Sequence, residues 1–219
     1  MSDFATIRGL VFDLDGTLID SYDAISESLN HACARLGAPA LPTGKVRLMV
    51  GRGLEQLVSD VLGEELVTAG VRLFRERYAQ VYAKGTFPLP GAAETLGSLR
   101  RRGYRLAVAS NKPARFSKAI LAAFDMLSFF ESVEGPDTAG VTKPDPAMVR
   151  RCLRAMGVDE AEALYVGDMV LDVETAGRAG LPVVLVHGGS SPEDELRSTG
   201  KPVLNSLAGL LELLQGAAF

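Results

Sequence analysis

The sequence predicts an α/β protein, in which a doubly wound, Rossmann-like parallel sheet carries a second, smaller α-helical domain inserted after the first strand. Three observations predict this fold. Short apolar runs typical of buried strands recur along the chain, most of them lead into helical patterns, and the long segment after the first run is helical. Alternating strands and helices favour a parallel sheet with helices on both faces.

Five apolar runs are predicted as the strands of the sheet. They are GLVFD (9–13), RLAVAS (105–110), FFESV (129–133), ALYVGD (163–168) and PVVLV (182–186). Continuous apolar runs of this length are typical of parallel strands that are buried on both faces. We therefore expect them to form the centre of the protein.

Helical patterns accompany these strands. They cover residues 92–102, 113–124, 146–156, 169–179 and 204–215. Pro113 and Pro146 stand where a first helical turn tolerates proline. We expect these helices to cover the sheet through right-handed crossovers.

The inserted helical domain is predicted over residues 21–84, and the α/β core over residues 1–20 and 85–219. From residue 21 to about residue 90 no run resembles a strand, and apolar residues recur at helical spacing in three segments. The connections on either side of the insertion are the candidate hinges. We expect the insertion to lie over the carboxyl ends of the strands, where open α/β sheets bind ligands.

Composition and charge exclude several classes of function. The chain has 219 residues and a net charge of -4, which argues against a nucleic-acid-binding surface. No apolar run approaches the roughly 20 residues that span a membrane, and the first residues lack a signal-peptide pattern. The two cysteines have no metal-type spacing, so we expect free thiols in a cytoplasmic protein with neither nucleic acid nor membrane as a partner.

The stretch LVFDLDGTLIDS places Asp13 and Asp15 at the end of the first strand. Because a strand repeats every two residues, both carboxylates project to the same side. They repel each other unless a cation lies between them or one is protonated. The pair therefore indicates metal binding, acid–base chemistry or both. Gly16 permits a sharp turn, and Thr17 is placed to cap or orient its neighbours.

Other polar residues follow later strands. Ser110 and Asn111 offer polar side chains beside the backbone N–H groups of a helix start, which form either an anion site or an ordinary helix cap. Lys143 lies in the loop GVTKPDP and would balance a phosphate and several carboxylates, unless it is only a surface lysine.

Asp168 and Asp172 close the fourth predicted strand, four residues apart. On a helical turn they share a face, which is unfavourable without a cation. Hard oxygen ligands without histidine or cysteine favour Mg²⁺ over zinc. The sequence therefore predicts a magnesium site at the strand ends.

The motifs DLDGT, SNK, KP and GDMVLD, in this order, resemble those of the haloacid dehalogenase superfamily of phosphotransferases. The resemblance covers essentially the whole chain. The segments RLMVGRGLEQLV, PLPGAAETLGSLRRRGYRLAVASNKP and KPDPAMVRRCL are similar to the phosphoglycolate phosphatase group. The resemblance implies Mg²⁺-dependent hydrolysis of a small phosphate monoester, with 2-phosphoglycolate as the candidate substrate.

The resemblance also implies a role for each motif. Asp13 would attack phosphorus to give an aspartyl-phosphate, and Asp15 would protonate the leaving-group oxygen and then activate water. Mg²⁺ would be held by the Asp13 carboxylate, the Asp15 backbone carbonyl and Asp168. Asp172 would act behind these ligands and pair with Lys143.

The remaining implied roles concern binding. Ser110, Asn111 and Lys143 would hold the phosphoryl oxygens, and the helical domain would select the substrate. Arg52, between two glycines, is a candidate for binding a substrate carboxylate bidentately, and Arg47 is a weaker one. The alternative interpretation of Arg52 is an exposed arginine at a helix start.

Other functions remain open at this stage. A phosphomutase similar to β-phosphoglucomutase would need a phosphorylated Asp13 that outlives substrate exchange, and LIDSYD stands where those enzymes have a histidine-containing segment. A pyrophosphatase or nucleotidase would use the same chemistry with a different fit to the helical domain. Either a monomer or a homodimer is compatible with the sequence.

Overall fold

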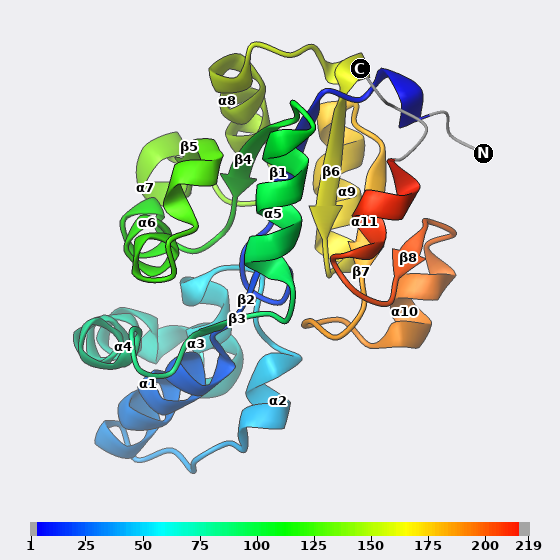
Figure 1. Ribbon diagram of the computed structural model, residues 1–219. Helices are drawn as coiled ribbons and strands as arrows, with labels where there is room; N and C mark the ends of the chain where they lie inside the picture. The colour runs from blue at the N-terminus through cyan, green and yellow to red at the C-terminus, as the bar shows by residue number, and fades with distance from the viewer. Residues whose placement is uncertain (1–3, 215–219) are drawn as a thin grey trace.

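A six-stranded parallel sheet lies at the centre of the computed structural model, which describes residues 4–214 (Figure 1). The strand order is β5-β4-β1-β6-β7-β8, and every neighbouring pair is parallel. The strands are β1 (Gly9–Phe12), β4 (Arg105–Ala109), β5 (Phe130–Glu134), β6 (Ala163–Gly167), β7 (Val183–Val186) and β8 (Val203–Leu204). The predicted fold class is confirmed.

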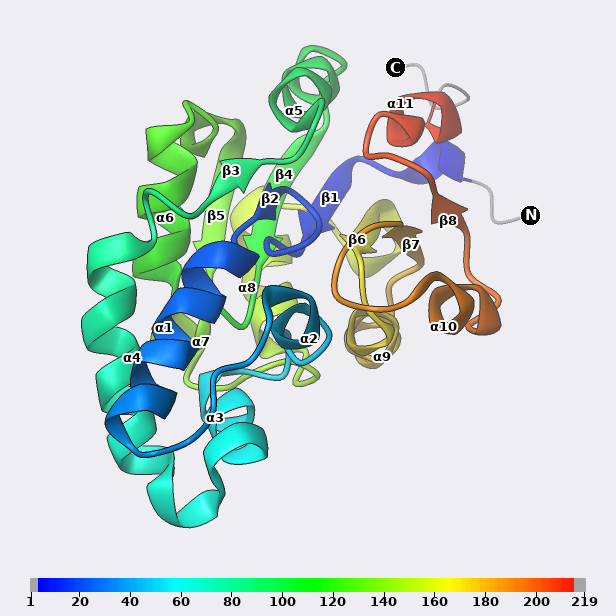
Figure 2. The same ribbon diagram turned by 90° about the horizontal axis from the view of Figure 1, so that it is seen from below.

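Helices cover both faces of this sheet (Figure 2). One face packs against α5 (Ala92–Arg101), α6 (Ala114–Ala123) and α11 (Gly209–Leu213), and the other packs against α8 (Ala147–Met156), α9 (Val170–Ala179) and α10 (Glu193–Ser198). Strand side chains alternate between the faces, so Leu10 and Phe12 join the first hydrophobic cluster and Val11 joins the second. Apolar runs that are buried on both sides therefore produce the two-layered core.

The order of the strands creates a crevice beside β1. From β1 the chain builds β4 and β5 toward one edge, and it then crosses back to place β6 on the other side of β1. At such a reversal the loops leave in opposite directions, and the carboxyl ends of the strands are open to a ligand. The motif that begins at Asp13 leaves β1 at this point.

Four helices form a separate group below the carboxyl ends of the strands in Figure 1. They are α1 (Tyr22–Arg35), α2 (Thr43–Arg47), α3 (Leu54–Leu62) and α4 (Val67–Val81). They share a hydrophobic cluster distinct from the two clusters on the sheet. Strands β2 (Ile19–Asp20) and β3 (Phe87–Pro88) pair antiparallel where the chain enters and leaves this group, so both connections run side by side. The division into residues 21–84 and the remainder stays a prediction.

Some short elements differ from the prediction. The stretch before residue 90 contains β3, and the helix predicted over residues 204–215 is instead β8 followed by α11, with residue 215 outside the described part. The shortest helical elements were not predicted: α7 (Pro136–Ala139), η1 (Phe4–Thr6), η2 (Glu64–Leu66), η3 (Leu127–Phe129) and η4 (Glu160–Glu162). Elements this short have no measurable periodicity. Between residues 4 and 214, no helix has the length and apolar character needed to cross a membrane.

Candidate active site

Lys143 joins two of the predicted site residues in the interior. Its ammonium lies 2.8 Å from Asp13 Oδ2 and 2.8 Å from Asp172 Oδ1. All three side chains are buried. The loop that carries Lys143 is held by Asn111, whose Oδ1 accepts a hydrogen bond of 2.7 Å from the Lys143 backbone N–H. One lysine thus balances two carboxylates, one directly after β1 and the other in the first turn of α9.

Asp168 and Asp172 are held by different donors, although they are close in sequence. Asp172 Oδ2 accepts hydrogen bonds of 3.0 Å from the N–H groups of Asp168 and Met169 at the start of α9. Asp168 instead accepts hydrogen bonds of 2.8 Å from the Thr17 hydroxyl and of 2.7 Å from the Ser190 N–H. Both carboxylates are fully buried. Thr17 therefore orients Asp168, as the sequence analysis allowed.

Asp15 turns away from this cluster toward another lysine. Its Oδ1 lies 2.5 Å from Lys112 Nζ, and it also accepts a hydrogen bond from the Ser21 hydroxyl. Lys112 Nζ is 3.1 Å from the same hydroxyl. The two aspartates at the end of β1 thus face different lysines, Lys143 for Asp13 and Lys112 for Asp15. These cations offset the repulsion expected between two neighbouring carboxylates.

The turn after Asp15 requires a glycine. Gly16 has φ +84°, and a Cβ at this residue would lie 2.5 Å from Asp168 Oδ2 and 2.5 Å from Tyr22 Oη. The Gly16 N–H donates to the Ile19 carbonyl at 2.8 Å. The backbone therefore doubles back beneath Asp168, which a side chain would prevent.

The loop after β4 brings Ser110 and Asn111 to the site, but the helix start beside them is used differently from the prediction. The first N–H groups of α6, at Ala114 and Arg115, donate to the Asp137 carboxylate at 2.6 and 3.2 Å. Neither Ser110 nor Asn111 caps α6, and these N–H groups are not available to an anion. Asp137 therefore supplies the cap at this helix start, and an anion site formed by Ser110 and Asn111 stays a prediction.

Burial dominates the electrostatics of the carboxylate cluster. Burial raises the pKa of Asp13 to about 6, against the opposing effect of Lys143. Burial, together with the charges of Asp172 and Asp13, raises the pKa of Asp168 well above its usual range. Burial alone would lower the pKa of Lys143, but the carboxylates of Asp13 and Asp172 outweigh it and raise that pKa. The cluster holds more negative charge than one lysine neutralises.

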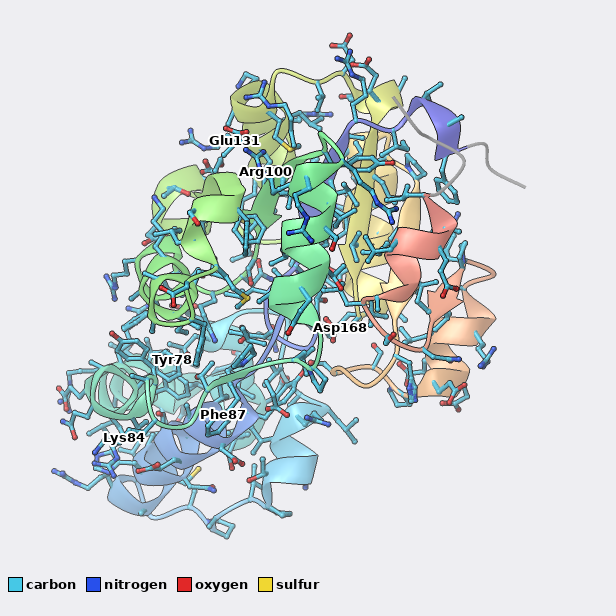
Figure 3. The ribbon with its side chains drawn as sticks, in the orientation of Figure 1. Tyr78, Lys84, Phe87, Arg100, Glu131 and Asp168 are labelled. Atoms are coloured by element: carbon cyan, nitrogen blue, oxygen red, sulfur yellow. The ribbon has the colours of Figure 1, made fainter. Side chains whose placement is uncertain are left out.

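The acidic side chains fit a hard divalent cation. Ligand oxygens of Asp13, Asp168 and Asp172 all lie within 4.8 Å of one another. Asp13 Oδ1 is buried without a hydrogen-bond partner, so one oxygen remains for a ligand. Oxygen donors alone suit Mg²⁺. Figure 3 shows Asp168 at the end of the sheet that faces the four helices, far from the Arg100–Glu131 ion pair.

The two arginines that the sequence proposed for substrate selection are placed elsewhere. Arg52 is exposed. Arg47 forms a 2.7 Å ion pair with Asp20 and covers the Tyr22 ring at 4.3 Å. Neither lines the cavity above Asp13 and Asp15. A role for either in binding a substrate carboxylate stays a prediction.

Several residues of the site were not assigned a role from the sequence. Lys112 is part of the motif SNK, and its position one residue after Asn111 was an available signal. Ser190 and Tyr165 carry no such signal, although the Tyr165 hydroxyl lies 3.2 Å from Asp172 Oδ1. The Ser190 contact spans 22 residues, and the Tyr165 hydroxyl also donates a hydrogen bond of 3.2 Å to the Ala109 carbonyl on β4, so the fold is needed to reveal them.

Comparison with known proteins agrees with this geometry. Residues 10–186 match the haloacid dehalogenase-like hydrolase family. A phosphoglycolate phosphatase of Cupriavidus necator is 36% identical over 215 residues, which are 95% of this chain and 93% of that protein. A phosphoglycolate phosphatase of Caulobacter vibrioides is 38% identical over 191 residues, covering 84% and 81%.

A solved structure extends the likeness to three dimensions. The crystal structure of a predicted phosphoglycolate phosphatase from Haemophilus somnus superposes with a TM-score of 0.87 at 27% identity, covering 96% of this chain and 99% of that one. The family match and the two relatives each span most of the chain. The chain therefore belongs to the haloacid dehalogenase-like hydrolase family, and within it to the phosphatases.

Proposed function

We propose that this phosphatase is Mg²⁺-dependent and hydrolyses a small phosphate monoester through an aspartyl-phosphate on Asp13. The observation that carries the proposal is the unpaired, buried oxygen of Asp13 beside Lys143. The names of the relatives make 2-phosphoglycolate the first substrate to test. A carboxylate nucleophile divides a difficult hydrolysis into two easier steps.

Two aspartates divide the chemistry in this proposal. Asp13 attacks phosphorus, and Asp15 protonates the leaving-group oxygen and then takes a proton from the attacking water. Lys112 and Ser21 hold the Asp15 side chain from the other side. In the second step this water attacks phosphorus and the bond between phosphorus and the Asp13 oxygen breaks, so the products are an alcohol and inorganic phosphate and Asp13 is regenerated.

The acidic cluster would hold Mg²⁺ through the Asp13 carboxylate, the Asp15 backbone carbonyl and Asp168, and Asp172 would hold Lys143 behind them. When bound, the ion supplies positive charge that offsets the repulsion between Asp13 and an anionic phosphate. Thr17 fixes the Asp168 carboxylate toward this position. The donors fit the ion because they are all oxygen atoms.

Ser110, Asn111 and Lys143 would bind the phosphoryl oxygens. All three line the same cavity as Asp13 and Asp15. Phosphoryl transfer depends mainly on alignment and on neutralising charge, which a hydroxyl, an amide and an ammonium supply. The Asn111 side-chain amide also donates a hydrogen bond of 2.7 Å to the Gly51 carbonyl, so it links the phosphate site to the helical group.

We further propose that residues 21–84 act as a cap domain on a core of residues 1–20 and 85–219, in a cytoplasmic enzyme. The separate hydrophobic cluster and the paired connections β2 and β3 support the cap. Two buried free cysteines support a reducing compartment. A small phosphate ester is the only partner that the proposal requires.

The experiment is phosphate release from 2-phosphoglycolate, sugar phosphates, pyrophosphate and nucleotides, each with Mg²⁺ or with EDTA. We expect release from at least one monoester with Mg²⁺ and none with EDTA. Release from pyrophosphate alone would contradict the monoester assignment. Release that is unchanged by EDTA would contradict the magnesium site.

A further inference from the structure

The cavity above the catalytic aspartates has two unlike ends. It has a volume of about 90 Å³ and contains Asp13, Asp15, Ser110 and Lys143 at its core end. The other walls come mostly from the helical group. They are formed by the side chains of Ile25, Val50, Leu54, Leu57, Phe74 and Tyr78, together with Phe116 of the core. The phosphate end is polar, and the leaving-group end is mainly apolar, with the Tyr78 hydroxyl and the Arg75 side chain as its polar groups.

Aromatic rings close this apolar end. Phe74 stacks on Tyr78 at 5.5 Å between ring centroids, and Phe116 meets the edge of Tyr78 at 5.1 Å. Phe74 and Tyr78 come from α4, whereas Phe116 belongs to α6 of the core. Figure 3 shows Tyr78 on the α4 side of the boundary between the helical group and the core. The rings therefore join both parts of the chain around the leaving group.

Each cation that lines the cavity already has an anionic partner. Lys143 pairs with Asp13 and Asp172, and Lys112 pairs with Asp15. Arg75 pairs with Glu55 at 2.9 Å, and both side chains are well exposed. The lysines are at the phosphoryl end, where the transferred group requires them. In the described lining, no cation is therefore free to bind a second anionic group on the substrate.

We propose that the preferred substrate is a phosphate monoester with an uncharged, apolar leaving group of the size of a branched alkyl chain or one aromatic ring. Such a group gains free energy by leaving water for this cavity. A carboxylate there would lose its hydration without a free cation to neutralise its charge, which is costly. The inference rests on the proposed phosphatase function. It predicts that esters with apolar leaving groups are better substrates than 2-phosphoglycolate.

Two esters of similar shape test this inference. Isobutyl phosphate carries two methyl groups where 2-phosphoglycolate carries its carboxylate oxygens. We expect kcat/KM to be at least about tenfold higher for isobutyl phosphate, because each cation in the described lining is already paired and none is free to neutralise the carboxylate. Along methyl, ethyl, propyl and butyl phosphate we expect kcat/KM to rise by about fourfold per methylene, the value for burying one CH₂ group.

A pair of variants locates the effect. Leu54→Lys places a cation in the cavity wall, and we expect it to lower kcat/KM for isobutyl phosphate and raise it for 2-phosphoglycolate. Leu48 is 59% exposed on the helical group and outside the cavity lining, so Leu48→Lys is the matched control and should keep the wild-type preference. Circular dichroism checks that both variants fold, and the ester series on wild type needs neither of them.

The outcomes separate the two proposals. A ratio below tenfold between the two esters, or no rise along the alkyl series, overturns the apolar leaving group while phosphate release upholds the phosphatase. Release from no ester at all overturns the proposed function itself. An equal loss of preference in Leu48→Lys and Leu54→Lys would also overturn the inference, because the effect would not come from the cavity.

Discussion

Gly16 shows how closely single residues are packed around the acidic cluster. Its φ of +84° is in the left-handed region, and a Cβ would meet Asp168 and Tyr22. We expect Gly16→Ala to reduce kcat by about 100-fold, the effect of a displacement near 1 Å at reacting groups. The measurement is phosphate release together with the melting temperature.

Gly37 provides the control for this prediction. It also has a positive φ, of +77°, but nothing lies within 4 Å of a Cβ there. Gly37→Ala should therefore cost about 1 kcal/mol of stability from backbone strain and leave kcat unchanged. Equal losses of activity in both variants would contradict the close approach at Gly16.

The raised pKa of Asp13 predicts how stability depends on pH in EDTA. Burial raises this pKa from 3.8 to about 6. The folded state therefore binds a proton that the unfolded state has released, and stability falls as the pH rises from about 4 to about 6. The shift corresponds to about 3 kcal/mol.

Asp13→Asn removes the buried charge, so it should be more stable than wild type by about that amount at pH 8 and nearly equal to it at pH 4. Urea unfolding at both pH values measures this. Asp23→Asn, which changes an exposed carboxylate on α1, should show no such trend. A constant difference for Asp13→Asn at both pH values would contradict desolvation as the main cause.

Among the elements, α6 depends on a residue that lies 22 to 23 positions after its first two residues. Asp137 accepts hydrogen bonds from the Ala114 and Arg115 N–H groups. Asp137→Ala should lower the free energy of unfolding by about 1 kcal/mol, the usual effect of losing an N-cap. Asp194→Ala, at an exposed residue of α10, is the control in urea unfolding. Equal effects would show that Asp137 does not cap α6.

The elements that the sequence predicted well are those with strong periodicity and full burial. Strands β1, β4 and β6 lie within the predicted runs, and α8 and α9 lie within the predicted helices. The helix predicted over residues 204–215 begins later, as α11 at Gly209, and its first predicted residue, Leu204, instead pairs with β7, because pairing with a distant strand leaves no local trace in the sequence.

The sequence identified the site residues that belong to local motifs but not those that depend on long-range contacts. Residues in the strand-end motifs were identified, because carboxylates after a buried strand are unusual. The cap on α6 by Asp137 and the support of Asp168 by Ser190 were not, because they depend on contacts between distant segments.

For the whole molecule, Mg²⁺ should stabilise the folded chain, because the ligand oxygens come together only when the sheet has formed. At an Mg²⁺ concentration of 100 times Kd the gain is about 2.7 kcal/mol. The gain should be larger at pH 8 than at pH 5, since protons compete with the ion for carboxylates whose pKa values are raised. Thermal unfolding with and without Mg²⁺ measures it.

Asp168→Asn and Asp60→Asn distinguish the site from general salt effects. Asp168 lies in the buried cluster, whereas Asp60 is exposed on α3. The gain in melting temperature should disappear in Asp168→Asn and persist in Asp60→Asn. Persistence in both would place magnesium elsewhere.

In the proposed mechanism Asp13 carries the phosphoryl group during turnover. The most direct test is rapid acid quenching during hydrolysis of the best ester, followed by mass spectrometry of the peptide that contains Asp13. We expect one phosphoryl group on Asp13 in the wild-type enzyme, and neither phosphorylation nor turnover in Asp13→Asn. A phosphoryl group on another residue, or full turnover by Asp13→Asn, would contradict it.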